Sequence, residues 1–268
     1  MFPTKAPLAA DPGNWSGAYA GLDLGVREGM TNATQNGVTI NGAAAPCVFA
    51  IFPGACVSSE PMNTTTFRIG GHLGYDWQFA PIWVAGVEGD FGWADRTVTF
   101  AGSPLPGAIN GFLVAVGCFS GLPGDSFSVR TTWDASVRGR VGILATPAVL
   151  FYATGGPAWL NFQSTLSCGL SPAGACFATM TPLSITNTTT RTGYTVGGGA
   201  ESRLWANWFL RAEYRYADYG TVSYVNTVLN APGGGVGPFV YKDSYSLRMQ
   251  THTVTFGVSY KFWDGLHG

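Results

Sequence analysis

Acidic and basic side chains alternate with apolar ones along several stretches of the chain, a spacing at which they could relay protons or ions. In residues 133–143, Asp134, Arg138 and Arg140 share one face, and apolar residues occupy the other. The same alternation assigns seven acids, seven bases and one histidine to the polar face. They are Asp23, Arg68, His72, Asp76, Glu88, Asp90, Asp134, Arg138, Arg140, Glu201, Arg203, Arg211, Glu213, Arg215 and Lys261. An ion path or proton relay is one interpretation, but the equal numbers of the two signs favour a core of mutually paired charges.

Two short blocks carry residue types suited to serine hydrolysis. Gly124-Asp-Ser126 is similar to the start of a lipase-type nucleophile block, and Asp264-Gly-Leu-His267 has the spacing of its acid and base. Ser126 enters a predicted strand at one end, whereas Asp264 and His267 follow another strand at the opposite end. Nucleophile and base would therefore lie far apart, and we expect no enzymatic activity.

The histidines do not form a metal-ligand pattern. His72 falls on the polar face and His252 on the apolar one, and no second histidine stands at ligand spacing. We expect a hydrogen-bonded His72 rather than a haem or metal ligand, and we predict no metal and no cofactor.

Five cysteines lie in polar or Gly/Pro-rich segments between the predicted strands. Cys47 with Cys56 and Cys168 with Cys176 could each close a short loop in an oxidising compartment, which leaves Cys118 unpaired. Free or mispaired thiols are the alternative. A metal site is disfavoured, because no Cys-x-x-Cys motif or nearby histidine accompanies them.

The elements that position these residues are predicted to be strands of a transmembrane barrel. Only 11% of the residues are charged and 14% are aromatic, yet no apolar run is long enough for a membrane helix. A closed barrel is the other way to satisfy every backbone polar group in lipid, so we predict an all-β, eight-stranded, antiparallel up-and-down barrel. The strand candidates are residues 15–27, 65–79, 83–100, 128–144, 149–165, 190–203, 208–226 and 247–262.

The predicted connections alternate between tight and long. Tight ones fall at 80–82, 145–148 and 204–207, and long ones at about 28–64, 101–127, 166–189 and 227–246. Bacterial outer-membrane barrels have this asymmetry, with short periplasmic turns and long external loops. The even strand number then puts both termini in the periplasm.

Aromatic residues frame the apolar faces of the strands. Trp83 and Trp93 are separated by about 25 Å of membrane height at a strand tilt of about 40°. A one-residue slip would place charges in lipid, at about 2–4 kcal/mol per Arg or Lys at the midplane, so we expect a fixed register. The predicted aromatic girdle comprises Trp15, Trp77, Trp83, Trp93, Trp133, Trp208 and Phe262.

The chain is expected to hold one domain with two short extensions. Residues 1–14 form a Pro/Ala-rich periplasmic leader, 15–262 the barrel and 263–268 a periplasmic tail. Because the first residues lack the apolar core of a signal peptide, we take the chain to be a mature exported form. A net charge of −1 without a Lys/Arg cluster argues against nucleic-acid binding.

Four blocks, in order along nearly the whole chain, resemble the small outer-membrane β-barrel family of alphaproteobacteria, a porin-like, OmpA-type barrel. They are Asn14-Trp-Ser-Gly-Ala-Tyr-Ala-Gly; residues 133–142 with 150–156; residues 194–201 with 208–216; and the closing residues 254–262. The resemblance implies a Gram-negative outer membrane and abundant surface proteins linked to envelope integrity, host contact and, in some members, haemin binding. The tail beyond Phe262 and the cysteine-bearing loops depart from the family pattern.

These observations together predict a structural and surface-interaction protein with a charge-filled, sealed lumen. The expected partners are outer-membrane lipid and lipopolysaccharide, with a second copy or another envelope protein at the external loops. A narrow porin is the main alternative, and a haemin-binding or lipid-modifying barrel is a weaker one. A porin would need unpaired lumen charges of one sign, and an enzyme would need a Ser/His/acid set at one rim.

Overall fold

The described part of the chain consists almost entirely of long β-strands. The computed structural model describes residues 14–44, 59–101, 126–168, 183–229 and 240–262. The strands are β1 (Gly17–Ile40), β2 (Ala43–Ala44), β3 (Ser59–Ala80), β4 (Trp83–Ala101), β5 (Ser126–Thr146), β6 (Val149–Cys168), β7 (Leu183–Trp205), β8 (Trp208–Leu229) and β9 (Val240–Lys261). In this part of the chain there is no helix with the length and hydropathy needed to cross a membrane.

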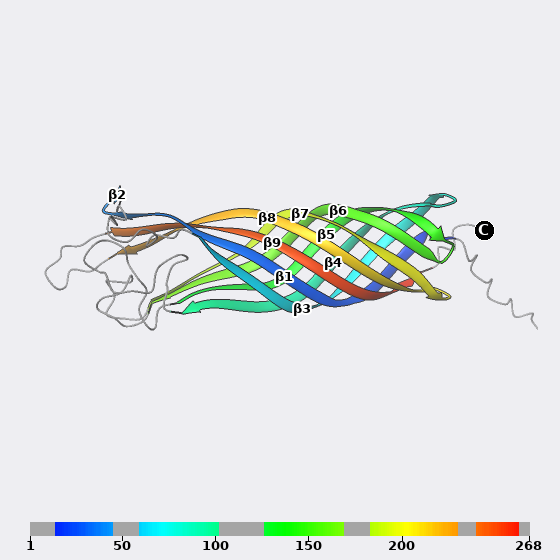
Figure 1. Ribbon diagram of the computed structural model, residues 1–268, viewed down its shortest axis with the longest axis horizontal. Coiled ribbons are helices and arrows are strands. Elements are labelled where there is room, and N and C mark those ends of the chain that lie inside the picture. Colours follow the sequence, from blue (N-terminus) through cyan, green and yellow to red (C-terminus); the bar gives the residue numbers. More distant parts are fainter. Residues whose placement is uncertain (1–13, 45–58, 102–125, 169–182, 230–239, 263–268) are drawn as a thin grey trace, which may run out of the picture.

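The strands form a closed antiparallel ring. Each long strand pairs with the next along the chain, and β9 pairs back with β1, while β2 pairs only with the tip of β1. Eight strands therefore make up the wall, which confirms the predicted fold (Figure 1). Tight turns at 81–82, 147–148 and 206–207 lie at one end, called the turn end here, where β1 also begins and β9 ends; the other is the loop end.

The strands are longer than predicted at the loop end. β1 continues to Ile40, β3 begins at Ser59, and β7 begins at Leu183, so much of the predicted loops 28–64 and 166–189 is strand. A tilted strand needs only about 9–11 residues to cross a bilayer, roughly half of these lengths. The sequence interpretation missed the extensions because it followed apolar residues on the outward face, which end where the membrane-spanning stretch ends.

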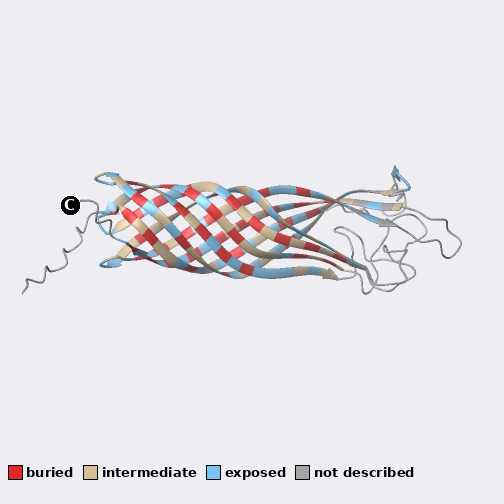
Figure 2. Cartoon of the chain, turned by 180° about the vertical axis from the view of Figure 1, so that it is seen from behind, coloured by how far each residue is buried: buried red, intermediate tan, exposed pale blue. Residues whose placement is uncertain are grey.

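The polarity of the inward and outward faces of the wall reverses along the barrel axis. Towards the turn end the outward face is apolar and the inward face charged, and buried and exposed residues alternate along each strand (Figure 2). Towards the loop end the outward face is rich in Thr, Ser, Asn and Gln, and the inward face is apolar. This inner cluster, the loop-end core, comprises Ala33, Met62, Phe127, Val129, Ala158, Leu160, Phe162, Ala217, Tyr219, Val222, Tyr245, Leu247 and Met249.

The barrel wall also divides into two sheets towards the loop end (Figure 1). Pairing of β3 with β4 extends from the turn end only to Ile69 and Trp93, and pairing of β7 with β8 only to Tyr194 and Asp218. All other neighbouring strands stay paired, which leaves β4-β5-β6-β7 facing β3-β1-β9-β8. The rings of Phe127 and Tyr245, 5.6 Å apart, join the sheets across the loop-end core, as in a β-sandwich.

Candidate functional site

The structure places the predicted polar-face residues, except Arg203, inside the barrel and brings them into one network. Fourteen of the fifteen are buried, and Arg203 is partly exposed near the turn end. They belong to strands on all sides of the lumen, because alternate side chains of every strand point inward. The network is therefore assembled by the closure of the barrel rather than by any local motif.

The part of the network nearest the loop end centres on Asp134. The Arg68 guanidinium, from β3, donates two hydrogen bonds to Asp134 Oδ1, at 2.7 Å from Nη2 and 3.0 Å from Nε. Arg68 Nη2 also lies 2.7 Å from Asp90 Oδ2, and Arg215 Nη1 lies 2.7 Å from Asp90 Oδ1. Arg27 Nη1 donates to Asp134 Oδ2 at 2.8 Å. These pairs link β1, β3, β4, β5 and β8.

The middle of the network joins opposite walls. Arg138 on β5 pairs with Glu213 on β8 at 2.8 Å and with Glu88 on β4. Arg211 Nη1 donates to Glu88 Oε2 at 2.8 Å, and the Tyr152 hydroxyl donates to Glu213 Oε2 at 2.8 Å. Each carboxylate thus accepts from several donors, the arrangement that offsets the cost of burying charge.

The part nearest the turn end combines ion pairs with an aromatic floor. Arg140 Nη1 lies 3.0 Å from Glu201 Oε1, and Lys261 Nζ lies 3.1 Å from Asp76 Oδ2. The Lys261 ammonium also lies 5.2 Å from the ring centre of Trp15, and the Trp15 and Phe209 rings meet edge to face at 5.0 Å. These rings pack with buried Val84, Leu150 and Tyr152 in one apolar cluster between the charges and the turn end.

His72 is a hydrogen-bonded lumen residue. Its Nδ1 lies 2.7 Å from Asp23 Oδ2 and its Nε2 lies 2.8 Å from Ser259 Oγ. Both ring nitrogens are thereby engaged. Among the residues that the structure describes, no group of three or more His, Cys, Asp or Glu side chains is placed to hold a metal ion.

Three network residues were missed by sequence analysis. Arg27 is fully buried and binds Asp134, and the phenols of Tyr19 and Tyr152 donate to Glu88 and Glu213. Arg27 stands four residues after Asp23 on the same face and ends the predicted strand 15–27, so the alternation could have identified it. Tyr19 and Tyr152 carry no charge, so a search for alternating charged residues could not identify them. With Arg27 in place of Arg203, the buried network holds seven acids and seven bases.

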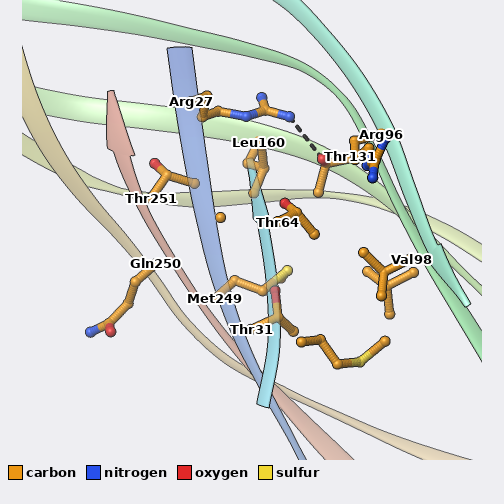
Figure 3. Close-up of a pocket in the computed structure, with 13 residues that line it drawn as sticks. Arg27, Thr31, Thr64, Arg96, Val98, Thr131, Leu160, Met249, Gln250 and Thr251 are labelled. Carbon is orange, nitrogen blue, oxygen red and sulfur yellow. Dashed lines mark hydrogen bonds between the residues drawn. The ribbon is translucent and has the colours of Figure 1, made fainter. Parts of the chain in front are cut away.

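A small cavity separates the charged network from the loop-end core. It measures about 20 Å³ and lies between Arg27 and the apolar side chains of Val98, Leu160 and Met249 (Figure 3). Such a volume holds about one water molecule. In Figure 3 the Arg27 side chain extends towards Thr131, to which Nη2 donates at 2.8 Å. Within the described residues, paired charges lie on one side of this cavity and apolar side chains on the other.

The aromatic residues predicted as a girdle fall into two outward bands, with one correction. Trp77, Trp83, Trp208 and Phe262 are exposed near the turn end, and Trp93 is exposed where the outward face becomes polar, opposite its strand partner Trp133. Trp15 was assigned wrongly, because its side chain is fully buried in the aromatic floor. Its indole N–H donates to the Pro147 carbonyl at 3.2 Å, so the residue lies in the barrel interior instead of facing lipid.

Beyond the outward aromatic band, polar side chains of β8 and β9 form a small cluster around Asp218. Gln250 Nε2 and Arg248 Nη2 donate to Asp218 Oδ2 at 2.9 and 3.3 Å, and the Gly220 amide donates to Oδ1 at 2.7 Å. Burial alone would raise the pKa of Asp218, but these hydrogen bonds outweigh it and hold the pKa below its usual range. His252 lies beside the cluster, 2.7 Å from the Tyr214 hydroxyl.

Several predicted residues fall outside the described part of the chain. Asp264 and His267 do, as do Cys47, Cys56, Cys118 and Cys176, and for Cys168 only the backbone is described. Ser126 begins β5 at the loop end, whereas β9, which precedes Asp264, ends at the turn end.

Comparison with known proteins gives matches along nearly the full length. The family model of the outer membrane protein β-barrel domain matches residues 4–262. The 31 kDa outer-membrane immunogenic protein of Brucella melitensis is 29% identical over 261 residues, covering 97% of this chain and 88% of the relative. The 25 kDa outer-membrane immunogenic protein of Brucella abortus is 26% identical over 266 residues, covering 97% and 85%.

A solved structure with similar architecture is that of the outer membrane protein OprG from Pseudomonas aeruginosa. The alignment covers 94% of this chain and 99% of OprG, with 12% sequence identity and a TM-score of 0.45.

Proposed function

Since this chain belongs to the outer membrane protein β-barrel domain family, as its sequence blocks predicted, we propose that it is a sealed structural barrel of the bacterial outer membrane. In this role it supports the envelope and presents its loop end for surface contacts, without passing solutes and without catalysis of its own. The observation that carries the proposal is the lumen, in which seven buried acids face seven buried bases.

Charge balance argues against a conducting lumen. A selective pore keeps charges of one sign free to meet the permeating ion. Here the carboxylates of Glu88, Asp90, Asp134 and Glu213 each accept from more than one arginine. Breaking any of these pairs to admit an ion would leave a buried charge without compensation, at a cost of several kcal/mol.

The two ends of the network support the same conclusion. The loop-end core lies on one side, and the floor of Trp15 and Phe209 on the other. An ion would have to leave water and cross apolar side chains on both sides of the charges.

In the proposed orientation the loop end is external and both termini are periplasmic. The polar outward face beyond Trp93 and Trp133 then stands at the level of the lipopolysaccharide head groups. It offers neutral hydrogen-bonding groups in rows, among them Asn161 with Thr190 and Gln163 with Thr188. The hydrogen-bonding groups of this surface favour lipopolysaccharide and other envelope molecules as partners.

Liposome swelling tests the proposal against the narrow-porin alternative. Liposomes loaded with the folded full-length protein should swell no faster in an iso-osmotic sugar or glycine solution than protein-free liposomes. A general porin reconstituted at the same ratio provides the positive control. Swelling that increases with the amount of folded protein would contradict the sealed barrel and support the narrow porin.

A further inference from the structure

The two seams between the sheets leave strand edges without partners. Above Ile69 and Trp93, β3 and β4 are not paired with each other, and the same holds for β7 and β8 above Tyr194 and Asp218, within the described residues. Each edge presents a row of backbone N–H and C=O groups. Such edges invite pairing with another strand unless the sequence protects them.

The seam between β3 and β4 has the sequence features that usually prevent an edge strand from pairing with another chain. Pro61 on the β3 edge has no N–H to donate, and Asp95 and Arg96 place charges on the β4 edge. Asp95 is held by Arg130, whose Nε lies 2.8 Å from Oδ1. Thr66 Oγ1 also donates across the seam to the Asp95 carbonyl at 3.4 Å.

The seam between β7 and β8 has almost none of these protective features. Residues 183–190 of β7 and 219–229 of β8 contain no charged residue and no proline, and they are rich in Thr, Val and Tyr, which favour strands. Charged side chains lie only at the base of the seam within the described residues: Asp218 is the last paired residue of β8, and Arg191 Nη2 donates to the Thr221 carbonyl at 3.3 Å. Gly220, with a φ of 70°, turns the chain there.

We propose that this seam is an interface between two copies of the chain. Above the membrane, the β7 edge of one protomer would pair with the β8 edge of its partner. The proposal goes beyond the role of the barrel in the envelope and does not depend on whether the lumen is sealed.

The direction of the strands makes a second copy the matching occupant. Two barrels in one membrane share an orientation, and in a closed dimer a twofold axis along the membrane normal relates them. This axis places β7 opposite the partner's β8, and β8 opposite the partner's β7. Because β7 and β8 run in opposite directions, both contacts are antiparallel, and all four edges of the two facing seams find partners.

The arrangement also extends the sandwich. The sheet β4-β5-β6-β7 of one protomer would continue into β8-β9-β1-β3 of the partner, and the second pair of sheets would join likewise. Val222 and Tyr224 on the inner face near the β8 edge would meet apolar neighbours from the other loop-end core. Val225 on the outer face of β8, 61% exposed in the single chain, would lie beside outward side chains of the partner's β7.

Charge-swapped seams test the proposal. Thr188 on β7 and Ser223 on β8 are both exposed on the outward face of the two edges. One form carries Thr188→Lys with Ser223→Lys, and the other carries Thr188→Asp with Ser223→Asp. Like charges should weaken self-association of each form by about tenfold or more. Co-expression of the two forms with different tags should restore a mixed dimer that co-purifies through both tags.

The matched control places the same charges away from an edge. Ser128 on β5 and Ser246 on β9 lie in the centre of the two sheets, so Ser128→Lys with Ser246→Lys should leave the wild-type dimer intact. Retention of the heat-modifiable band on detergent gels confirms folding of every form. A wild-type chain that is monomeric in the membrane, or seam and control variants that behave alike, would overturn the proposal. So would two seam forms that remain separate when mixed, because the edges would then close within one chain or bind another protein.

Discussion

Arg138 on β5 and Glu213 on β8 meet at 2.8 Å across the lumen, joining strands that are not neighbours in the wall. Both side chains are almost completely buried, and Arg138 also pairs with Glu88 on β4. This contact ties opposite walls of the barrel through charge rather than through an apolar core. The stability of the barrel should therefore depend on lumen charges.

The first prediction concerns the loss of one such charge. Arg138→Ala leaves Glu88 and Glu213 short of a partner in the buried lumen, which should lower the free energy of unfolding by about 3–5 kcal/mol. The urea midpoint in detergent, followed by the heat-modifiable gel band, measures the change. Arg130→Ala is the control, because its pair with Asp95 is exposed and should contribute little. Equal midpoints for the two variants would contradict the network.

The second prediction concerns the space that Arg68 needs. A Cβ atom on Gly92 would lie 2.1 Å from Cζ of Arg68, and the guanidinium could not keep its bonds to Asp134. Gly92→Ala should therefore destabilise the barrel by about 1–3 kcal/mol. Gly89→Ala, on the same strand, meets no atom closer than 3.9 Å and should be tolerated. The same unfolding assay compares them, and a tolerated Gly92→Ala would show that Arg68 is free to move.

The sequence predicted the part of the structure that alternation determines. Side chains on a strand alternate between two faces, so the inward position of Asp23, Glu88 or Lys261 followed once the outward apolar face was recognised. Arg27 is the last residue of the predicted strand 15–27 and lies on the same face as Asp23, but it was not included among the polar-face residues. The lumen partners could not be predicted, since strand pairing alone does not determine which arginine reaches which carboxylate across the lumen.

The rest depends on interactions that a single sequence does not display. The strand extensions bury apolar side chains such as Met62 inward and place polar side chains outward, which reverses the pattern used to find the membrane strands. The seams depend on where neighbouring strands separate. Trp15 resembled a membrane-interface tryptophan by type and position, but Phe209 and Lys261 draw its ring into the barrel.

The third prediction places the membrane boundary on β4. Val87 is 61% exposed on the apolar band, so Val87→Arg should cost about 2–4 kcal/mol and reduce assembly into the outer membrane. Thr99→Arg, on the outward face of the same strand beyond Trp93, should assemble normally. The fraction of heat-modifiable protein in isolated outer membranes measures assembly. Equal loss for both variants would place the boundary beyond Trp93.

The fourth prediction concerns acid and the loop end. The pKa of Asp218 is lowered in the folded protein, because the hydrogen bonds from Gln250, Gly220 and Arg248 outweigh burial. Folding therefore favours the ionised form, and its contribution is complete above the usual pKa of about 4 and lost as the pH falls through the lowered value. Asp218→Asn should have a lower urea midpoint than wild type at neutral pH, and the difference should shrink in acid. A difference that is independent of pH would contradict this role.

The claim that the lumen is sealed is tested most directly by single-channel recording of the folded full-length protein in planar lipid bilayers. If paired charges, the loop-end core and the aromatic floor fill the lumen as proposed, the current should stay at baseline at both polarities. The heat-modifiable band in the recovered membrane verifies insertion. Reproducible steps of constant amplitude, whose frequency rises with the amount of inserted protein, would contradict the sealed barrel.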